Sequence, residues 1–204
     1  MFGDNNTNTP VTATFKGLKI INAQSNETLK KRSLMFNIAH RFGDIGGYAG
    51  GVHTLYGFDA STDIRFSFDY GINNKFQVGI GRAKGIEPMQ EFYDVNLKYK
   101  LLEQTTNNHI PFSLTLIGMG GASTRVASSD ITSPAYFGNS FAHRLSYTSQ
   151  LIIAHKFSPK FSLEIIPSYN HRNLVAFADQ NDLLSLGMAA RFKITKRFAI
   201  ISDY

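Results

Sequence analysis

Hydrophobic and polar positions alternate most strictly between residues 62 and 102. Three runs place an apolar side chain at every second position: Ile64, Phe66, Phe68 and Tyr70; then Phe76, Val78 and Ile80; then Tyr93, Val95, Leu97, Tyr99 and Leu101. The positions between them are charged, polar or glycine. Successive side chains of a strand point to opposite faces, so this pattern predicts antiparallel strands with one apolar and one polar face.

The same alternation recurs along the rest of the chain. It predicts nine strands, at residues 33–41, 62–70, 76–82, 93–102, 111–124, 141–155, 161–169, 184–194 and 198–204. Short turns and longer loops alternate along the chain. The short turns are at 71–74, 105–109, 157–160 and 195–197, and the longer loops are at 43–61, 83–91, 125–140 and 171–181. Short turns at one end and long loops at the other are typical of outer-membrane barrels. The predicted fold is therefore all-β, an antiparallel up-and-down transmembrane β-barrel of the outer-membrane type.

The N-terminal residues do not follow this pattern. We expect residues 1–32 to be a lead-in or periplasmic segment, tucked into the barrel mouth, and residues 33–204 to form the barrel strands. Bacterial single-chain barrels have even strand numbers, and a spanning sheet has to close. Either the strand-like piece at 11–15 joins the wall or, as we expect, further strands follow residue 204. The first residues resemble no signal peptide, so we also expect that a leader has been removed.

Composition narrows the class of protein. The chain of 204 residues has no cysteine and no tryptophan, but 17 Phe and 9 Tyr, which suffice for aromatic girdles at membrane interfaces. No run approaches the ~20 consecutive apolar residues of a membrane helix. The net charge of +6 is scattered through strands and turns rather than gathered into a basic block, which argues against nucleic acid as a partner.

Several short motifs occur in a fixed order along the first half of the chain. They are Thr14-Phe15-Lys16, Ile20-Ile21-Asn22-Ala23-Gln24-Ser25, Glu27-Thr28, His40-Arg41-Phe42-Gly43, Leu55-Tyr56-Gly57-Phe58-Asp59, Tyr70-Gly71-Ile72, Val78-Gly79-Ile80-Gly81-Arg82 and Leu97-Lys98-Tyr99-Lys100-Leu101-Leu102. In these motifs the chain resembles the membrane-bound β-barrel domain family of unknown function that is common in Bacteroidetes. The resemblance covers residues 12–102, and the remainder by pattern. It implies a Gram-negative outer-membrane barrel and implies no reaction.

Charged residues on the polar face are the candidate lumen-lining groups. They are Asp63, Arg65, Asp69, Arg82, Asp94, Lys98, Lys100, Arg144, Glu164 and Arg191. Burying them unpaired would cost several kcal/mol each, so they have to face water or one another. One interpretation is an ion-paired interior that fills a small barrel. The other is a hydrated, cation-rich lumen for anionic solutes, and both stay open because the strand number sets the width.

Catalytic chemistry has little support in the sequence. The six histidines show neither the i, i+4 spacing of a helical zinc site nor a His-x-His pair, so we expect no metal and no cofactor. Ser146 or Ser149 with His143 or His155 would suit a barrel-type lipid hydrolase, yet no Gly-x-Ser-x-Gly motif is present. We therefore expect that the protein is not an enzyme and keep the lipid hydrolase as a minor alternative.

The functional expectation is porin- or transporter-like passage or binding of small solutes, anions among them. The alternative is a structural or accessory barrel subunit of an envelope complex. Outer-membrane lipids and other envelope proteins are the expected partners. A soluble lipocalin-like barrel would place all the charges outside, and the aromatic-rich apolar faces together with the loop asymmetry argue against it.

Overall fold

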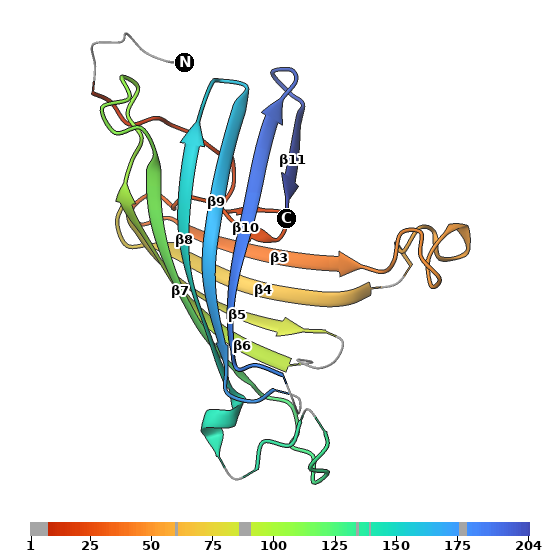
Figure 1. Cartoon of the computed structure of the whole chain (residues 1–204). Coiled ribbons are helices and arrows are strands. Elements are labelled where there is room, and N and C mark those ends of the chain that lie inside the picture. The colour runs from red at the N-terminus through yellow and green to blue at the C-terminus, as the bar shows by residue number, and fades with distance from the viewer. Residues whose placement is uncertain (1–7, 60, 86–90, 134, 139, 176–178) are drawn as a thin grey trace.

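A single large antiparallel sheet makes up most of the molecule. The computed structural model describes residues 8–59, 61–85, 91–133, 135–138, 140–175 and 179–204. Nine strands follow one another in the sheet in chain order (Figure 1): β3 (Leu34–Phe42), β4 (Ser61–Gly71), β5 (Phe76–Lys84), β6 (Glu91–Leu102), β7 (Ser113–Ser123), β8 (Leu145–Lys156), β9 (Phe161–Arg172), β10 (Asp182–Lys193) and β11 (Ala199–Asp203). The predicted all-β antiparallel meander is confirmed.

Each strand has the two faces that its sequence predicts. In β6, for example, Asp94, Asn96 and Lys98 are buried on one face, while Tyr93 and Val95 are exposed on the other. Antiparallel pairing brings like faces together across the sheet, since Val78 lies opposite both Tyr70 and Leu97. We call the polar side the inner face and the apolar side the outer face.

Three of the short turns are closed in the same way. The Oδ1 atom of Asn73 accepts hydrogen bonds from the N–H groups of Lys75 and Phe76, both at 2.8 Å. The hydroxyls of Ser158 and Thr195 accept the corresponding pairs of N–H groups in the β8–β9 and β10–β11 turns. Such side-chain acceptors replace a backbone turn bond, which keeps these hairpins short and fixes their register.

Among the described residues, two 3₁₀ helices occur in the long loops, η1 (Val52–Thr54) and η2 (Phe141–Arg144). The strand predicted from residue 141 therefore begins only at Leu145. Among the residues described, no helix is long and apolar enough to cross a membrane.

The sheet remains open along both edges. In its strand order β3 and β11 are the outermost members, and within the described part of the chain they do not pair with each other. The strand-like piece at 11–15, which was the less favoured candidate for a further wall strand, does not join the sheet: Pro10 makes only an isolated bridge to Thr105, and Ala13 has a positive φ of 51°. The lead-in before residue 8 and the middle of the predicted loop 83–91 lie outside the described residues.

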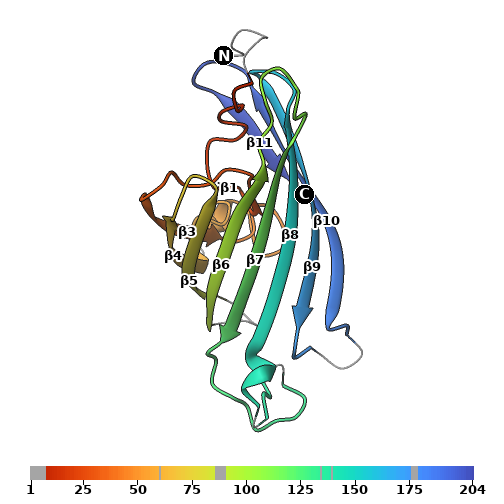
Figure 2. The ribbon, with the colours of Figure 1, turned by 90° about the vertical axis from the view of Figure 1, so that its left-hand side faces the viewer.

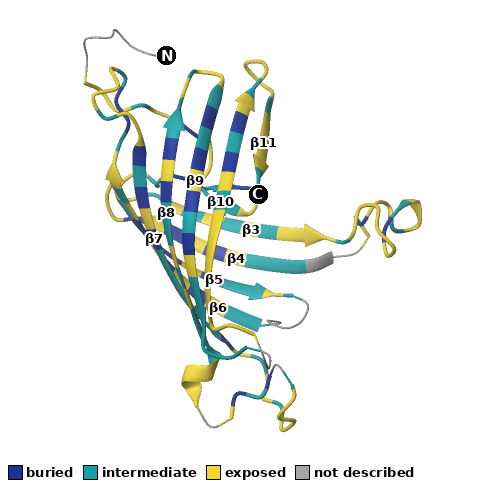
Figure 3. Ribbon diagram, in the orientation of Figure 1, coloured by how far each residue is buried: buried dark blue, intermediate teal, exposed yellow. Residues whose placement is uncertain are grey.

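Of the described residues before β3, those from 12 to 31 lie along the inner face. They contain a two-strand hairpin of β1 (Lys19–Ile20) and β2 (Ala23–Gln24) outside the large sheet, and Figure 2 labels β1. Figure 3 shows buried positions alternating with less buried ones along β8, β9 and β10 in the part of the sheet beside these residues. We call residues 12–31 the N-terminal segment.

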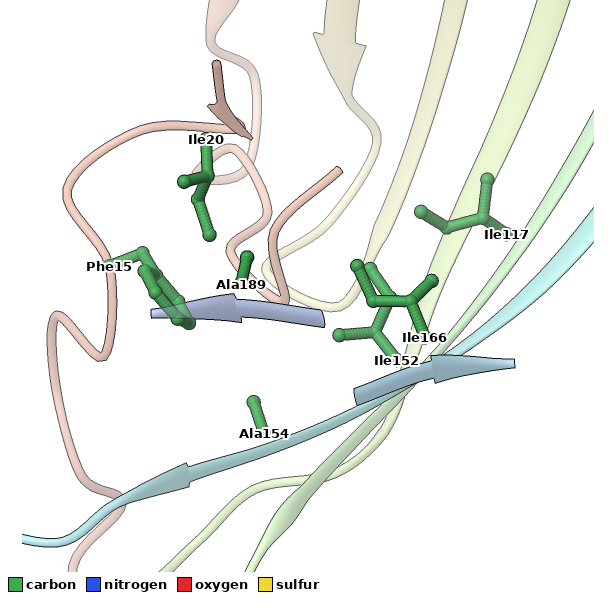
Figure 4. Close-up of a cluster of buried hydrophobic side chains, with 7 residues drawn as sticks. All are labelled: Phe15, Ile20, Ile117, Ile152, Ala154, Ile166 and Ala189. Carbon is green, nitrogen blue, oxygen red and sulfur yellow. The ribbon is translucent and has the colours of Figure 1, made fainter. Parts of the chain in front are cut away.

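An apolar cluster joins this segment to the sheet. Phe15 and Ile20 of the segment belong to one buried group with five inner-face residues of β7–β10, namely Ile117, Ile152, Ala154, Ile166 and Ala189 (Figure 4). These five positions are apolar on a face that is mainly polar. The inner face is thus built to receive apolar side chains at one place, and the N-terminal segment supplies them.

Candidate functional site

The candidate site is the inner face together with the N-terminal segment that lies on it. Most of the charged groups predicted to line a lumen project from this face, and the end of each strand from which they project decides what they contact. Groups near the long loops contact one another. Most groups near the short turns contact the segment.

The best-defined ion pair near the long loops spans three strands. Arg65 of β4 reaches across β5 to Asp94 of β6, with Nε 3.0 Å from Oδ2 and Nη2 2.5 Å from Oδ1. This two-point contact has the geometry in which guanidinium and carboxylate bind most strongly. It passes over Gly81, where a Cβ would lie 2.4 Å from Nη2 of Arg65 and 2.7 Å from Oδ2 of Asp94. The glycine therefore makes room for the pair rather than for a ligand.

A second polar row lies closer to the turns. The Oδ1 atom of Asp69 lies 3.4 Å from Nε2 of Gln77 and 3.5 Å from Nδ2 of Asn96, so two amides donate weakly to it. Gly79 lies between Asp69 and Asn96 in the sheet, and a Cβ at Gly79 would lie 2.2 Å from Oδ1 of Asp69. Asp63, nearer the loops, lies opposite Arg41 of β3. Acidic groups of β4 and β6 are thus met by donors of the same face.

Lys98 binds the N-terminal segment with all three of its ammonium protons. Its Nζ atom lies 3.2 Å from the carbonyl oxygen of Leu18, 3.0 Å from that of Ser25 and 3.2 Å from that of Glu27. Only 1% of the residue is exposed. An ammonium group has three donors, so this arrangement satisfies it completely without a carboxylate partner.

Other cations of the turn side contact the start of the segment. The Nζ atom of Lys156 lies 2.7 Å from the carbonyl oxygen of Thr12 and 3.2 Å from that of Ala13. The Nη1 atom of Arg191 lies 3.5 Å and 3.4 Å from the carbonyl oxygens of Ala13 and Thr14. Cationic side chains therefore satisfy the carbonyl groups that a strand would satisfy by pairing.

Acceptors of the same face bind the N–H groups of the segment. Oε2 of Glu164 accepts from Asn26 at 3.3 Å, and Oε1 of Gln77 accepts from Leu29 at 3.0 Å. Oδ2 of Asp203 accepts from Asn22 at 2.6 Å and from Ala23 at 2.7 Å. Within the described residues Oε1 of Glu164 and Oδ1 of Asn26 are buried without a hydrogen-bond partner. Lys19 of the segment lies in this polar interior, where burial first and Arg65 second lower its pKa.

Two predicted lumen residues, Arg82 and Arg144, do not project from the inner face of a strand. Arg82 does not face inward: it lies opposite Tyr93, and its guanidinium carbon is 5.4 Å from the centroid of that ring on the outer face. Its place in the β5 alternation, with Ile80, dictates this, so the inward prediction for Arg82 was wrong.

Arg144 also departs from the prediction, because it belongs to η2 and not to a strand. Its Nη1 donates to the carbonyl oxygens of Ser123 and Arg125 at 3.1 and 2.7 Å, and its guanidinium carbon lies 4.2 Å from the centroid of the Phe137 ring. It therefore fastens the β7–β8 loop instead of lining the interior. Lys100, at the turn end of β6, lies 3.3 Å from Glu103.

The residues weighed for hydrolase chemistry are not brought together. Ser146 and Ser149 lie on opposite faces of β8, opposite Arg172 and Gly118 respectively. Nδ1 of His143 lies 2.7 Å from the carbonyl oxygen of Phe137, and a ring nitrogen of His155 is bonded to the carbonyl of Pro111. In the part of the chain that the structure describes, no three His, Asp or Glu side chains gather as metal ligands would.

The segment-binding role of Lys98, Glu164 and Arg191 was not predicted from the sequence. A signal was present, since Ile117, Ile152 and Ile166 occupy inward positions of strands that otherwise alternate. Apolar residues on a polar face indicate that something covers it. Nothing in the pattern indicated which part of the chain does so.

Comparison with protein families gives one match. A family model described as "Membrane bound beta barrel domain (DUF5777)" matches residues 15–204. No curated protein matches the chain. The match begins within the N-terminal segment and therefore includes most of the residues that bind the inner face, but not the Thr12, Ala13 and Thr14 carbonyl groups bound by Lys156 and Arg191.

Proposed function

Because the chain belongs to the family of membrane-bound β-barrel domains, we propose that it is an outer-membrane barrel whose polar interior binds or passes small solutes. The N-terminal segment closes the turn side of this interior at rest. Passage follows when the segment leaves its place on the inner face.

The way in which the segment is held is the observation that carries this proposal. Its backbone is bound by side chains such as Lys98, Glu164 and Arg191 and not by the strand pairing that would make it a permanent part of the wall. Water or a polar solute can take over each of these hydrogen bonds, so the seated and the released state both leave the inner face satisfied. Cations that bind carbonyl groups in the seated state become available to anionic solutes in the released state.

A pocket beside the segment supports solute binding. It measures about 380 Å³ and lies among Asn22 and Ala23 of the segment, Gln150 and Ser168 of the sheet, and Asp203 of β11. A volume of this size falls within the ~300–1,000 Å³ of small-molecule sites. Oε1 of Gln150 is buried there without a hydrogen-bond partner among the described residues, so the pocket offers a free acceptor to a bound molecule.

The open edges have a consequence in a membrane. Hydrocarbon offers no partner for backbone N–H and C=O groups, so the edges formed by β3 and β11 have to be covered in the inserted protein. However these edges are covered, the inner face of the nine described strands already carries its polar residues and the segment.

The accessory-barrel alternative keeps one specific support. Arg65 and Asp94 satisfy each other, and the amides of Gln77 and Asn96 approach Asp69, which is how a closed structural interior would be built. A structural barrel needs no released state, and this difference separates the two functions.

Planar-bilayer recording of the purified full-length protein tests the proposal, with Lys98→Met and Lys100→Met as a matched pair. Both lysines belong to β6 and share its inner face, yet of the two Lys98 is the one whose Nζ atom binds the segment. We expect rare openings in the parent and in Lys100→Met, and frequent or lasting openings in Lys98→Met. A folded Lys98→Met barrel that conducts no more often than Lys100→Met would refute solute passage and favour the accessory role.

A further inference from the structure

A groove crosses the outer face above β7, on the opposite side of the sheet from the interior just described. It measures about 710 Å³ and is lined by side chains of β4, β5, β6 and β8 around the backbone of β7. Two cross-strand rows form its centre, and each has a small residue between two large ones. The rows are Val95–Gly120–Tyr147 and Tyr93–Ala122–Leu145.

The hollow exists because Gly120 and Ala122 have little or no side chain, and not because the backbone is unusual. Gly120 has no positive φ, and a Cβ there would first meet the ring of Tyr147 at 3.6 Å, an ordinary contact distance. A larger residue would therefore fit the strand and fill the groove. Leu116 closes the groove toward the short turns, because it is the next large residue on this face of β7 and lies between Tyr99 and Leu151.

A cation marks the other end, toward the long loops. The guanidinium carbon of Arg82 lies 5.4 Å from the centroid of the Tyr93 ring, and Arg82 lines the groove. One row further, Nζ of Lys84 is 3.9 Å from a carboxylate oxygen of Glu91, so that acid already has a partner. The groove is therefore apolar along its length and cationic at the end that faces the headgroup region of a membrane.

We propose that this groove binds one anionic membrane lipid, with an acyl chain along β7 and the headgroup phosphate on Arg82. Charge complementarity selects this occupant: a guanidinium binds phosphate strongly, whereas a zwitterionic headgroup carries its own cation. An arginine on a lipid-facing surface is otherwise costly, and a bound phosphate removes that cost. The proposal depends on the membrane-barrel family and not on solute passage.

A second outer hollow provides an internal comparison. It measures about 580 Å³ and is lined by Leu184 and Tyr169 among others. The hydroxyl of Tyr169 is bonded to the carboxylate of Asp182, which also lies 2.7 Å from Nδ1 of His171. An acid borders this hollow where Arg82 borders the groove, so it does not favour an anionic headgroup.

Tryptophan fluorescence with brominated lipids measures the preference, because the chain has no tryptophan of its own. Tyr147→Trp places a single reporter in the groove, and Leu184→Trp places one in the second hollow. Each protein is reconstituted in phosphatidylcholine vesicles that contain increasing fractions of brominated phosphatidylglycerol or brominated phosphatidylcholine. The quenching curves give the relative binding constant of the two lipids at each reporter.

We expect the groove reporter to prefer phosphatidylglycerol about fivefold, the value for one basic side chain at a membrane surface. The second-hollow reporter has no preference. Adding Arg82→Gln to the groove reporter abolishes the preference, and Arg82→Lys keeps it. Adding Gly120→Val also abolishes it by filling the groove, whereas Gly118→Val, two residues along the same face and outside the lining, leaves it unchanged.

Two results would overturn the lipid site. One is equal quenching by the two lipids at the groove reporter, and the other is a preference that survives both Arg82→Gln and Gly120→Val. Heat-modifiable migration in gels shows that each variant is folded, and since the two substitutions act on opposite ends of the ligand, the test does not depend on either one alone.

Discussion

The binding of the N-terminal segment by Lys98 leads to the most direct quantitative prediction. Replacing Lys98 with methionine keeps the length of the side chain and removes three donors to the carbonyl oxygens of Leu18, Ser25 and Glu27. Hydrogen bonds with a charged partner contribute about 1.5–3 kcal/mol each, which gives about 5–9 kcal/mol as an upper bound. Methionine also avoids the several kcal/mol of desolvation that the buried ammonium pays.

The net effect is a loss of about 2–4 kcal/mol from the free energy that holds the segment on the inner face. Since 1.36 kcal/mol corresponds to a factor of ten, the fraction of molecules with a released segment rises about 30- to 1,000-fold. The barrel strands themselves keep their pairing, so we expect this to be local opening rather than global unfolding.

Thiol modification measures this opening, because the chain contains no cysteine. Ser25→Cys introduces one thiol at a position that is fully buried while the segment is seated. The rate of its reaction with a polar maleimide reports how often the segment leaves. Lys98→Met in this background should react about 30- to 1,000-fold faster than the parent.

Lys100→Met is the control for a lysine lost from the same strand and face. Its Nζ atom lies 3.3 Å from Glu103, a pair whose loss is worth about 0–1 kcal/mol, so the rate should change less than about fivefold. Equal rates in Lys98→Met and Lys100→Met would refute the reasoning, because they would show that the three carbonyl contacts do not hold the segment.

Three further predictions concern the energetics of the inner face. Asp94→Asn leaves the Arg65 guanidinium without its ion-pair partner in the interior and should cost about 3–5 kcal/mol, seen as a lower denaturant midpoint for loss of heat-modifiable migration. Gly79→Ala places a Cβ 2.2 Å from a carboxylate oxygen and should cost about 1–3 kcal/mol, whereas Gly118→Ala, with nothing within 4 Å, should stay within about 0.5 kcal/mol. Phe15→Ala leaves a cavity in the buried cluster that joins the segment and the sheet. It should lower the free energy that holds the segment by about 3 kcal/mol and increase the maleimide rate accordingly.

The strands could be predicted from the sequence because period-2 alternation is a local signal. Each strand carries its own apolar face, as in Phe66 and Phe68 of β4, so no knowledge of its neighbours is needed. The main error at a strand boundary concerned residues 141–144. They were predicted to belong to the strand that is β8, but they form η2. There the side chain of Arg144 binds carbonyl groups of the preceding loop, a contact that no alternation encodes.

The position of the N-terminal segment could not be predicted in detail for a related reason. Its backbone contacts depend on side chains more than 70 residues away, such as those of Lys98 and Glu164, and it has no period of its own. Arg82 shows the opposite error. The alternation of β5 places it on the outer face beside Tyr93, and its charge alone suggested the interior.

The distribution of contacts along the strands divides the interior into two functional halves. On the loop side the charged groups neutralise one another, as Arg65 and Asp94 do, and there a small solute would meet a fixed polar wall. On the turn side Lys98, Lys156 and Arg191 donate to peptide carbonyl groups, which carry no net charge. The acids that contact the segment there, among the described residues, are Glu164, Asp203 and the segment's own Glu27. Release of the segment therefore uncovers net positive charge at one end of the pathway only. Under the proposed function, the open state should prefer anions. The frequent Lys98→Met openings should be less anion-selective than the rare parental openings, because Lys98→Met removes one positive charge.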